Sequence, residues 1–176
     1  MPSGLHAFFA GDPGRTTGVA GCYVQFKGTL KETLLTATNK KAIELKGPWL
    51  EQGRTLGHLM DRFVYRANVE ALIPLDNIHL VMEDFVLRRR REGGATGDLT
   101  SIWVAAAANA FYAAAPDNNG IAAAHLGVVP VVWQQPSEGK FVDNVKLKAY
   151  GLYEVGSEHK RDAWRHIATR VDKLLP

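Results

Sequence analysis

Three short segments near the N-terminus constrain the fold of this chain most strongly. Leu5–Ala10 is a continuous apolar run that ends at a glycine, as expected for a buried strand. Val19–Phe26 carries β-branched and aromatic residues and predicts a second strand, and Thr33–Thr38 predicts a third. Because only short, glycine-containing segments separate them, we expect these strands to form an antiparallel meander.

The remainder of the chain alternates helices and strands. Residues 56–71 place apolar side chains on one helical face, and Pro74 ends that helix. The further elements expected are a strand at Ile78–Met82, a loop at 88–98, a helix at 99–115 capped by Asp98, a strand at Val128–Trp133, a short helix at 141–150 and a helix at His159–Leu174. The main elements therefore follow the order βββαβαβα, which predicts a mixed α/β fold.

Length and composition are those of an ordinary globular protein. A chain of 176 residues predicts one domain, residues 1–176, with a core large enough to fold without disulfide bonds. Cys22 is the only cysteine, which excludes an intrachain disulfide and fits a reducing compartment. No apolar run reaches the roughly 18 residues that span a bilayer, and the N-terminal segment lacks signal-peptide features. We therefore expect a soluble, cytoplasmic protein with no membrane partner.

Positive charge is concentrated in the second half of the chain. Residues 1–87 carry nine basic and nine acidic side chains, whereas residues 88–176 carry 12 basic and nine acidic ones. With an isoelectric point near 9.0, this distribution favours a polyanionic partner. A solvated surface without a partner is the alternative.

Acidic side chains follow two of the predicted buried strands. Asp12 comes after the first strand in a glycine-rich turn that lets the backbone approach a ligand. Glu83 and Asp84 follow the strand at Ile78–Met82, and because successive strand residues point to opposite faces, we expect only one of them to join a site. Taken singly, a turn aspartate before proline or two solvated carboxylates at a strand end would also explain these residues.

A third candidate lies in Glu158-His-Lys-Arg-Asp162, at the start of the last predicted helix. His159 and Asp162 are three residues apart and therefore share a helical face. Acids in a first helical turn also interact favourably with the helix dipole, which is the structural alternative.

Together these segments supply three carboxylates and one imidazole, from Asp12, Glu83, His159 and Asp162. This donor set suits Mg²⁺ or Mn²⁺. Nucleases that hold two such ions draw their ligands from several segments of the chain. We therefore predict a site with two divalent ions, in which these four residues are the candidate catalytic residues and metal ligands.

The same motifs resemble those of the RuvC Holliday junction resolvases, above all the short resolvase-like proteins encoded by phages. Gly-Asp-Pro-Gly at residues 11–14 resembles the first acidic motif of that family. Val81-Met-Glu-Asp-Phe85 resembles the second, with Glu83 as the ligand. His159-x-x-Asp162, followed by Ala163, resembles the last motif in its histidine-bearing form.

This resemblance implies an RNase H-like fold, with a mixed five-stranded sheet flanked by helices. It implies a homodimeric, metal-dependent endonuclease that hydrolyses phosphodiester bonds in four-way DNA junctions. The adjacent Asp84 leaves open which acid of the pair binds metal. Phe85 lies close to the position of an aromatic residue that acts at the junction centre in the family, although a core aromatic is the alternative.

Basic residues near these motifs are candidate DNA contacts. Four consecutive arginines follow the second acidic motif: Arg88, Arg89, Arg90 and Arg91. Arginine pairs bidentately with phosphate, so we expect all four to contact the DNA backbone. Lys140 and Lys146 lie in a segment whose lysines approach the DNA backbone in the resembled family. A solvated, charged loop is the alternative for the arginine run.

Other functions fit parts of the same pattern. The motifs define phosphodiester hydrolysis rather than the DNA shape recognised, so a flap or single-strand nuclease of the RNase H-like class is the main alternative. Residues 11–18 also resemble the phosphate loop of the sugar kinase and actin group, but those proteins need two such domains. A DNA-binding module without activity is the third possibility.

For the homodimer, the alanines at 105–108 and 113–115 would allow close helix packing between subunits, unless this helix packs on its own sheet.

Overall fold

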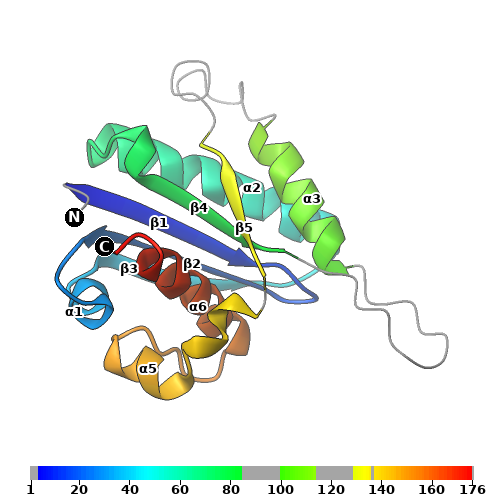
Figure 1. Cartoon of the computed structure of the whole chain (residues 1–176). Helices are drawn as coiled ribbons and strands as arrows, with labels where there is room; N and C mark the ends of the chain where they lie inside the picture. The colour runs from blue at the N-terminus through cyan, green and yellow to red at the C-terminus, as the bar shows by residue number, and fades with distance from the viewer. Residues whose placement is uncertain (1–3, 85–99, 114–128, 136, 176) are drawn as a thin grey trace.

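A five-stranded mixed sheet organises the computed structural model, which describes residues 4–84, 100–113, 129–135 and 137–175 (Figure 1). β1 (Leu5–Asp12), β2 (Thr17–Gln25) and β3 (Thr38–Leu45) form an antiparallel meander. β4 (Ile78–Glu83) and β5 (Val131–Gln134) run parallel to β1. The strand order β3-β2-β1-β4-β5 puts β1 at the centre, and the predicted fold class is confirmed.

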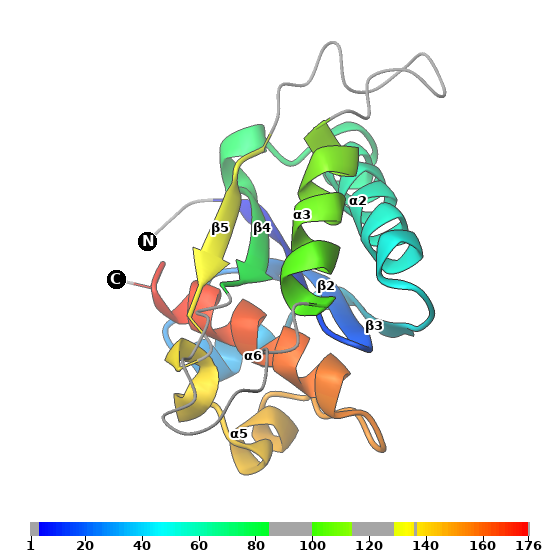
Figure 2. The ribbon, with the colours of Figure 1, turned by 90° about the vertical axis from the view of Figure 1, so that its right-hand side faces the viewer.

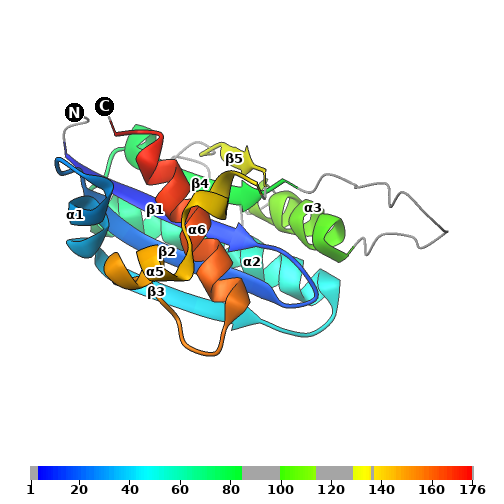
Figure 3. The same cartoon turned by 60° about the horizontal axis from the view of Figure 1, so that its bottom comes forward.

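Helices cover both faces of the sheet. α2 (Trp49–Tyr65) and α3 (Thr100–Ala113) lie on one face, while α6 (Glu158–Asp172), with α1 (Leu30–Leu35) and α5 (Asn144–Ala149), lies on the other (Figures 1 and 3). β1 shows why both faces must be covered, because side chains alternate along a strand. Ala7 and Phe9 join the core under α2 and α3, whereas Phe8 and Ala10 join the core under α6.

The alanine-rich helix α3 packs against α2 of the same chain. Two glycines of α2 make this approach possible, since a Cβ on Gly53 would lie 2.5 Å from the Cβ of Ala107 and one on Gly57 would lie 2.7 Å from the carbonyl oxygen of Ala108. Close packing through alanine was expected, but it occurs within one chain. The alanine pattern therefore gives no independent argument for a dimer.

The predicted third strand at Thr33–Thr38 is wrong. Residues 30–35 form α1, and β3 begins only at Thr38. The Thr29 side chain accepts a hydrogen bond from the backbone of Glu32, and the Glu32 side chain accepts one from the backbone of Thr29. This reciprocal capping box stabilises the first turn of a helix and outweighs the β-propensity of the threonines.

The other elements deviate less from prediction. The α2 segment begins at Trp49 and continues into a π-helical turn, Arg66–Glu70, before the chain reaches β4. The single helix expected at 141–150 is a 3₁₀ turn, Glu138–Phe141, followed by α5, which Asp143 caps. The proposed cap Asp98 lies outside the described residues. Within the described ranges, no helix has both the length and the apolar character needed to cross a membrane.

Candidate metal centre and active site

Strand register brings Asp12 and Glu83 to the same end and face of the sheet. In the parallel β1–β4 pair, Ala10 is the partner of Val81. Two residues further along each strand, Asp12 and Glu83 point to the same face, the one that α6 crosses (Figure 2). Asp84 accepts a hydrogen bond from the amide of Gln135 at 2.6 Å instead and lies outside this group.

A close backbone contact positions the N-terminus of α6 over these carboxylates. A Cβ on Gly18 of β2 would lie 1.9 Å from the carbonyl oxygen of His159, so only glycine permits this approach. Ser157 caps the helix by accepting from the backbone of Lys160, and its hydroxyl donates to Glu44 of β3. The first turn of α6 is therefore attached to both β2 and β3.

Two of the predicted residues, His159 and Asp162, lie on this turn of α6. His159 Nδ1 is 3.2 Å from a carboxylate oxygen of Asp12, so this predicted pair is in direct contact. Asp162 forms an ion pair with Arg165, one turn along the helix. Arg165 also donates to the carbonyl of Val142 at 3.0 Å, which orients its guanidinium. Asp162 is thus near the site but is partnered by an arginine.

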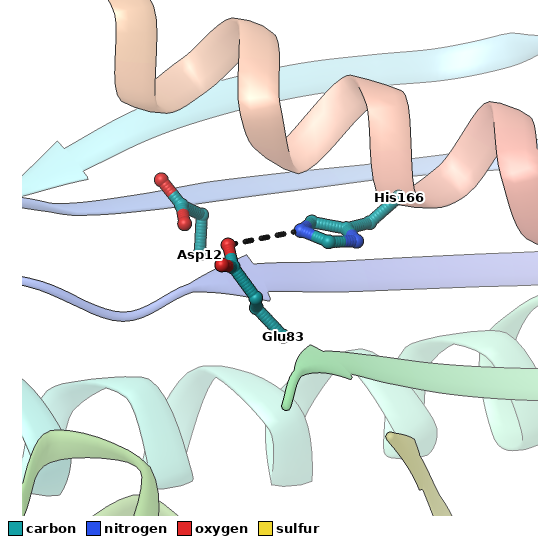
Figure 4. A group of neighbouring side chains, drawn as sticks. All are labelled: Asp12, Glu83 and His166. Atoms are coloured by element: carbon teal, nitrogen blue, oxygen red, sulfur yellow. Dashed lines mark hydrogen bonds and ion pairs between the residues drawn. The ribbon is translucent and has the colours of Figure 1, made fainter. Parts of the chain in front are cut away.

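A second histidine, His166, enters the site although the sequence motifs did not single it out. Its Nε2 is 3.3 Å from a carboxylate oxygen of Glu83, and its side chain is buried. One ligand atom from each of Asp12, Glu83 and His166 lies within 4.8 Å of the others (Figure 4). His166 is seven residues after His159, which is two helical turns, so helical spacing was the available signal.

Burial and mutual proximity perturb the pKa values of this cluster. Burial raises the pKa of Asp12 to about 8, and the neighbouring charges of Glu83 and Asp162 add to this effect, while the contact with His159 opposes it. Burial would also raise the pKa of Glu83, but its hydrogen bonds with His166 and Asp12 lower it overall. The hydrogen bond with Asp12 raises the pKa of His159 against the effect of burial.

This donor set fits a divalent cation. Two carboxylates that burial makes costly to ionise are stabilised by a shared positive charge. Carboxylate oxygens suit Mg²⁺ and Mn²⁺, and imidazole nitrogen is acceptable to Mn²⁺. Neighbouring ligands of one such ion, each about 2.1 Å from it, lie about 3 Å apart, which is close to the spacing of His166 and Glu83.

A groove of about 490 Å³ opens beside the cluster. Glu83, Asp162 and His166 lie in its wall, together with Lys140 from the 3₁₀ turn. Lys146 does not line this groove and donates to the backbone carbonyl of Phe141.

The other predicted DNA contacts cannot be placed relative to this groove. They lie outside the described residues, directly after β4 in sequence: Phe85, Arg88, Arg89, Arg90 and Arg91. Their contact with DNA therefore stays a prediction from the sequence.

Comparison with known proteins supports the fold assignment. No family model matches this sequence, and no curated protein matches it. Among solved structures, RuvC from Thermus thermophilus superposes with a TM-score of 0.53 at 16% sequence identity, over 93% of this chain and 92% of the RuvC chain. At this identity the likeness establishes architecture and not activity. This chain therefore has a RuvC-like fold of the RNase H type.

Proposed function

We propose that this protein is a metal-dependent endonuclease that resolves four-way DNA junctions, in the manner implied by its resemblance to phage-type RuvC resolvases. The convergence of Asp12, Glu83 and His166 at one end of the sheet, beneath the turn that carries His159, is the observation that supports this function best. Buried carboxylates are costly for a fold, and a divalent cation that acts on phosphate explains their presence.

Bound Mg²⁺ or Mn²⁺, with two ions per site, would supply activation of the attacking water and charge stabilisation at the leaving oxygen. The protein side chains would hold and orient these ions. Asp12 and Glu83 are the proposed principal ligands, and His159 and Asp162 complete the predicted set from α6. Asp162 would have to exchange its ion pair with Arg165 for this role. Asp84, bound to Gln135, is the less suitable member of its acidic pair.

The groove beside the cluster is the proposed path of the DNA backbone. Lys140 lies in its wall with Glu83, so a phosphate contact there would bring the backbone close to the carboxylates. Lys146 remains a proposed phosphate contact, and Phe85 remains a proposed contact at the junction centre. Further phosphate contacts are proposed for the arginine run: Arg88, Arg89, Arg90 and Arg91.

The protein would work as a homodimer in the cytoplasm. Resolution of a four-way junction needs two nicks on opposed strands, and these require two sites related by a two-fold axis. Sedimentation that gives only a 19.3 kDa monomer, with and without junction DNA, would contradict the homodimer.

Cleavage of a defined set of DNA substrates tests the proposed activity. Four-way junction, flap, duplex and single-stranded DNA would be incubated with the protein in Mg²⁺ and in Mn²⁺, with products mapped on both strands. Paired nicks at the junction centre are the expected result. Preferred cleavage of a flap or a single strand would establish the alternative RNase H-like nuclease.

A further inference from the structure

His166 lies between two polar partners in the interior of the protein. Its Nε2 faces Glu83 at 3.3 Å, and its Nδ1 faces the side-chain oxygen of Gln134 at 3.1 Å. His166 is 3% exposed and Gln134 is 1% exposed, so bulk water does not compete for these contacts. Gln134 reaches this place because it is the register partner of Glu83 in the β4–β5 pair.

The contact with Gln134 indicates which ring nitrogen of His166 carries the proton. An amide oxygen only accepts hydrogen bonds, so Nδ1 of His166 must be the donor. In the neutral ring, Nε2 then carries a lone pair, and this lone pair faces a carboxylate oxygen of Glu83. Two acceptors at this distance repel each other unless a proton or a metal ion lies between them.

The orientation of Gln134 is itself costly. Its Nε2 is buried and has no hydrogen-bond partner among the residues that the structure describes. An unsatisfied buried donor costs about 1–3 kcal/mol. The reverse amide orientation would let Nε2 donate to the histidine ring and would turn His166 into a hydrogen-bond donor to Glu83. With the amide oriented as in the structure, Nε2 of His166 carries the lone pair and is available for a ligand.

We propose that Nε2 of His166 directly ligates a divalent transition-metal ion of the Mn²⁺ type. Asp12 and Glu83 bind the same ion. Gln134 is the positioning residue that holds the required tautomer. This inference rests on the proposed metal-dependent function and adds a nitrogen ligand that the predicted set did not contain. Metal-bound histidines commonly donate their other ring N–H to an oxygen in this way.

A nitrogen ligand from the interior would bias the site towards Mn²⁺. Imidazole is acceptable to Mn²⁺, whereas Mg²⁺ favours oxygen ligands and water. His159 is the other imidazole in the site, but its side chain is 43% exposed, and it contacts Asp12. The two histidines can therefore be separated by mutation.

Pulsed electron paramagnetic resonance of bound Mn²⁺ provides a direct test, since it detects coupling to a ligating ¹⁴N nucleus. The full chain, with any polyhistidine tag removed, would be loaded with Mn²⁺ as the wild type and as His159→Ala. Nitrogen coupling should persist in His159→Ala, where His166 is intact, and should disappear when His166→Gln is added. Loss of all nitrogen coupling in His159→Ala alone would overturn the proposal, as would a wild-type protein whose bound Mn²⁺ shows no nitrogen coupling.

Replacement of Gln134 tests the tautomer. Gln134→Leu should weaken Mn²⁺ binding about 10–100-fold, the usual effect of losing an outer partner of a metal-bound histidine. The loss of Mg²⁺ affinity should be smaller. His58→Ala, on the exposed side of α2, is the matched control and should leave both affinities unchanged. Unchanged Mn²⁺ affinity in a folded Gln134→Leu protein would contradict the role of Gln134.

These measurements remain separate from the nuclease proposal. Junction cleavage without nitrogen coupling would overturn the role of His166 and leave the nuclease intact. Nitrogen-coupled Mn²⁺ in a protein that cleaves no DNA would support the metal ligand and overturn the nuclease.

Discussion

β1 and β4 carry a pair of titratable side chains at each end of their shared face. Asp12 and Glu83 lie at one end, and His6 and His79 lie at the other. Both pairs are on the α6 side. His6 and Asp12 in β1, and His79 and Glu83 in β4, are an even number of positions apart, so their side chains point to the same face. The two ends thus pose the same physical problem, which is how to bury two polar, ionisable groups side by side.

The histidine end is buried without ionic charge, although Nε2 of His6 has no hydrogen-bond partner among the described residues. Nδ1 of His6 is 3.2 Å from Nε2 of His79, and the two rings are nearly parallel. Phe8 and Phe26 pack around them. Burial lowers the pKa of His79 to about 4, with help from the charge of Arg170, and burial also lowers the pKa of His6. At neutral pH, both rings are therefore uncharged and share one hydrogen bond.

The carboxylate end differs, because its two acids contact histidines of α6, Asp12 with His159 and Glu83 with His166. Burial raises the pKa of Asp12 to about 8, and the proximity of Glu83 strengthens this effect. A buried imidazole becomes neutral by releasing a proton at neutral pH, whereas a buried carboxylate becomes neutral only by gaining one. The acidic end is therefore suited to a cation, and the histidine end serves the stability of the core.

The largest expected effect is at the acidic end. Asp12→Asn preserves the size of the side chain but removes the charge that a divalent ion requires. We expect cleavage of a four-way junction to fall by several orders of magnitude, with junction binding kept or improved because a repulsive charge is lost. Cleavage and binding assays on the purified variant measure both effects. Near-normal turnover would contradict the nuclease proposal.

In the absence of metal, Asp12→Asn should increase the stability of the fold relative to the wild type. Because the folded-state pKa of Asp12 is above its ordinary value of 3.8, its stabilising contribution is present at low pH and is lost as pH rises towards about 8. In EDTA, the wild type should therefore become less stable than Asp12→Asn as pH rises from about 5 to about 8. Thermal unfolding at both values measures the difference. If the wild type is more stable than the variant at the higher pH in EDTA, ionisation of the buried Asp12 carboxylate does not destabilise the fold.

Sequence reasoning found the acidic end because its signals are local. An acid directly after a buried strand is visible in the sequence, and neighbouring parallel strands bring Asp12 and Glu83 together. The signal for His166 was weaker, since it consisted only of helical spacing from His159, and its partner Gln134 lies one residue beyond the predicted strand, at the end of β5. The histidine end was missed as well. His6 and His79 are 73 residues apart, and only strand register makes them a pair.

The fold was predicted where hydrophobic periodicity was strong. The central strand β1 is buried along nearly its whole length, and its apolar run marked it clearly. The third strand was misplaced because threonine has high β-propensity, while Thr29 and Glu32 form a capping box that starts a helix. The capping box thus favours a helix at residues 30–35, and β3 begins after this helix, at Thr38.

The histidine end should control stability in acid. The folded-state pKa of His79 is below its ordinary value of 6.5, so its stabilising contribution is present above about pH 6.5 and is lost as pH falls towards about 4. The loss should amount to about 3 kcal/mol. Replacing both histidines with leucine removes the titration and leaves no unpaired partner. Urea unfolding between about pH 4 and about pH 7 measures this difference.

Junction cleavage at neutral pH is the control for the histidine pair. The double variant His6→Leu/His79→Leu should keep the activity of the wild type, because both histidines lie at the opposite end of β1 and β4 from the acidic cluster. An unfolding free energy with the same acid dependence as the wild type would show that other groups control acid stability. Loss of cleavage in a folded double variant would break the separation between the two ends.

Gly18→Ala should damage the acidic end selectively. The new Cβ would meet backbone atoms of His159 and Lys160, which no side-chain rotation can relieve, so the first turn of α6 must shift. We expect a loss of stability of about 1–3 kcal/mol together with weaker Mn²⁺ binding. Gly28→Ala is the matched control, because its Cβ would approach only the flexible end of Glu32, at 3.4 Å. Equal effects of the two variants on Mn²⁺ affinity would argue against a positioning role for Gly18.

The smallest effect concerns the direction from which DNA approaches. Lys140 lines the groove beside the acidic cluster. Lys31 is exposed on α1, which follows the end of β2 that pairs with His6. One lost phosphate contact lowers the slope of log affinity against log salt by about 0.9. Lys140→Ala should show this change for junction DNA, and Lys31→Ala should show none. Titrations at several salt concentrations measure both slopes. The two variants remove the same charge from exposed sites. Equal slopes would therefore mean that Lys140 contacts no phosphate and that DNA reaches the acidic end along another surface.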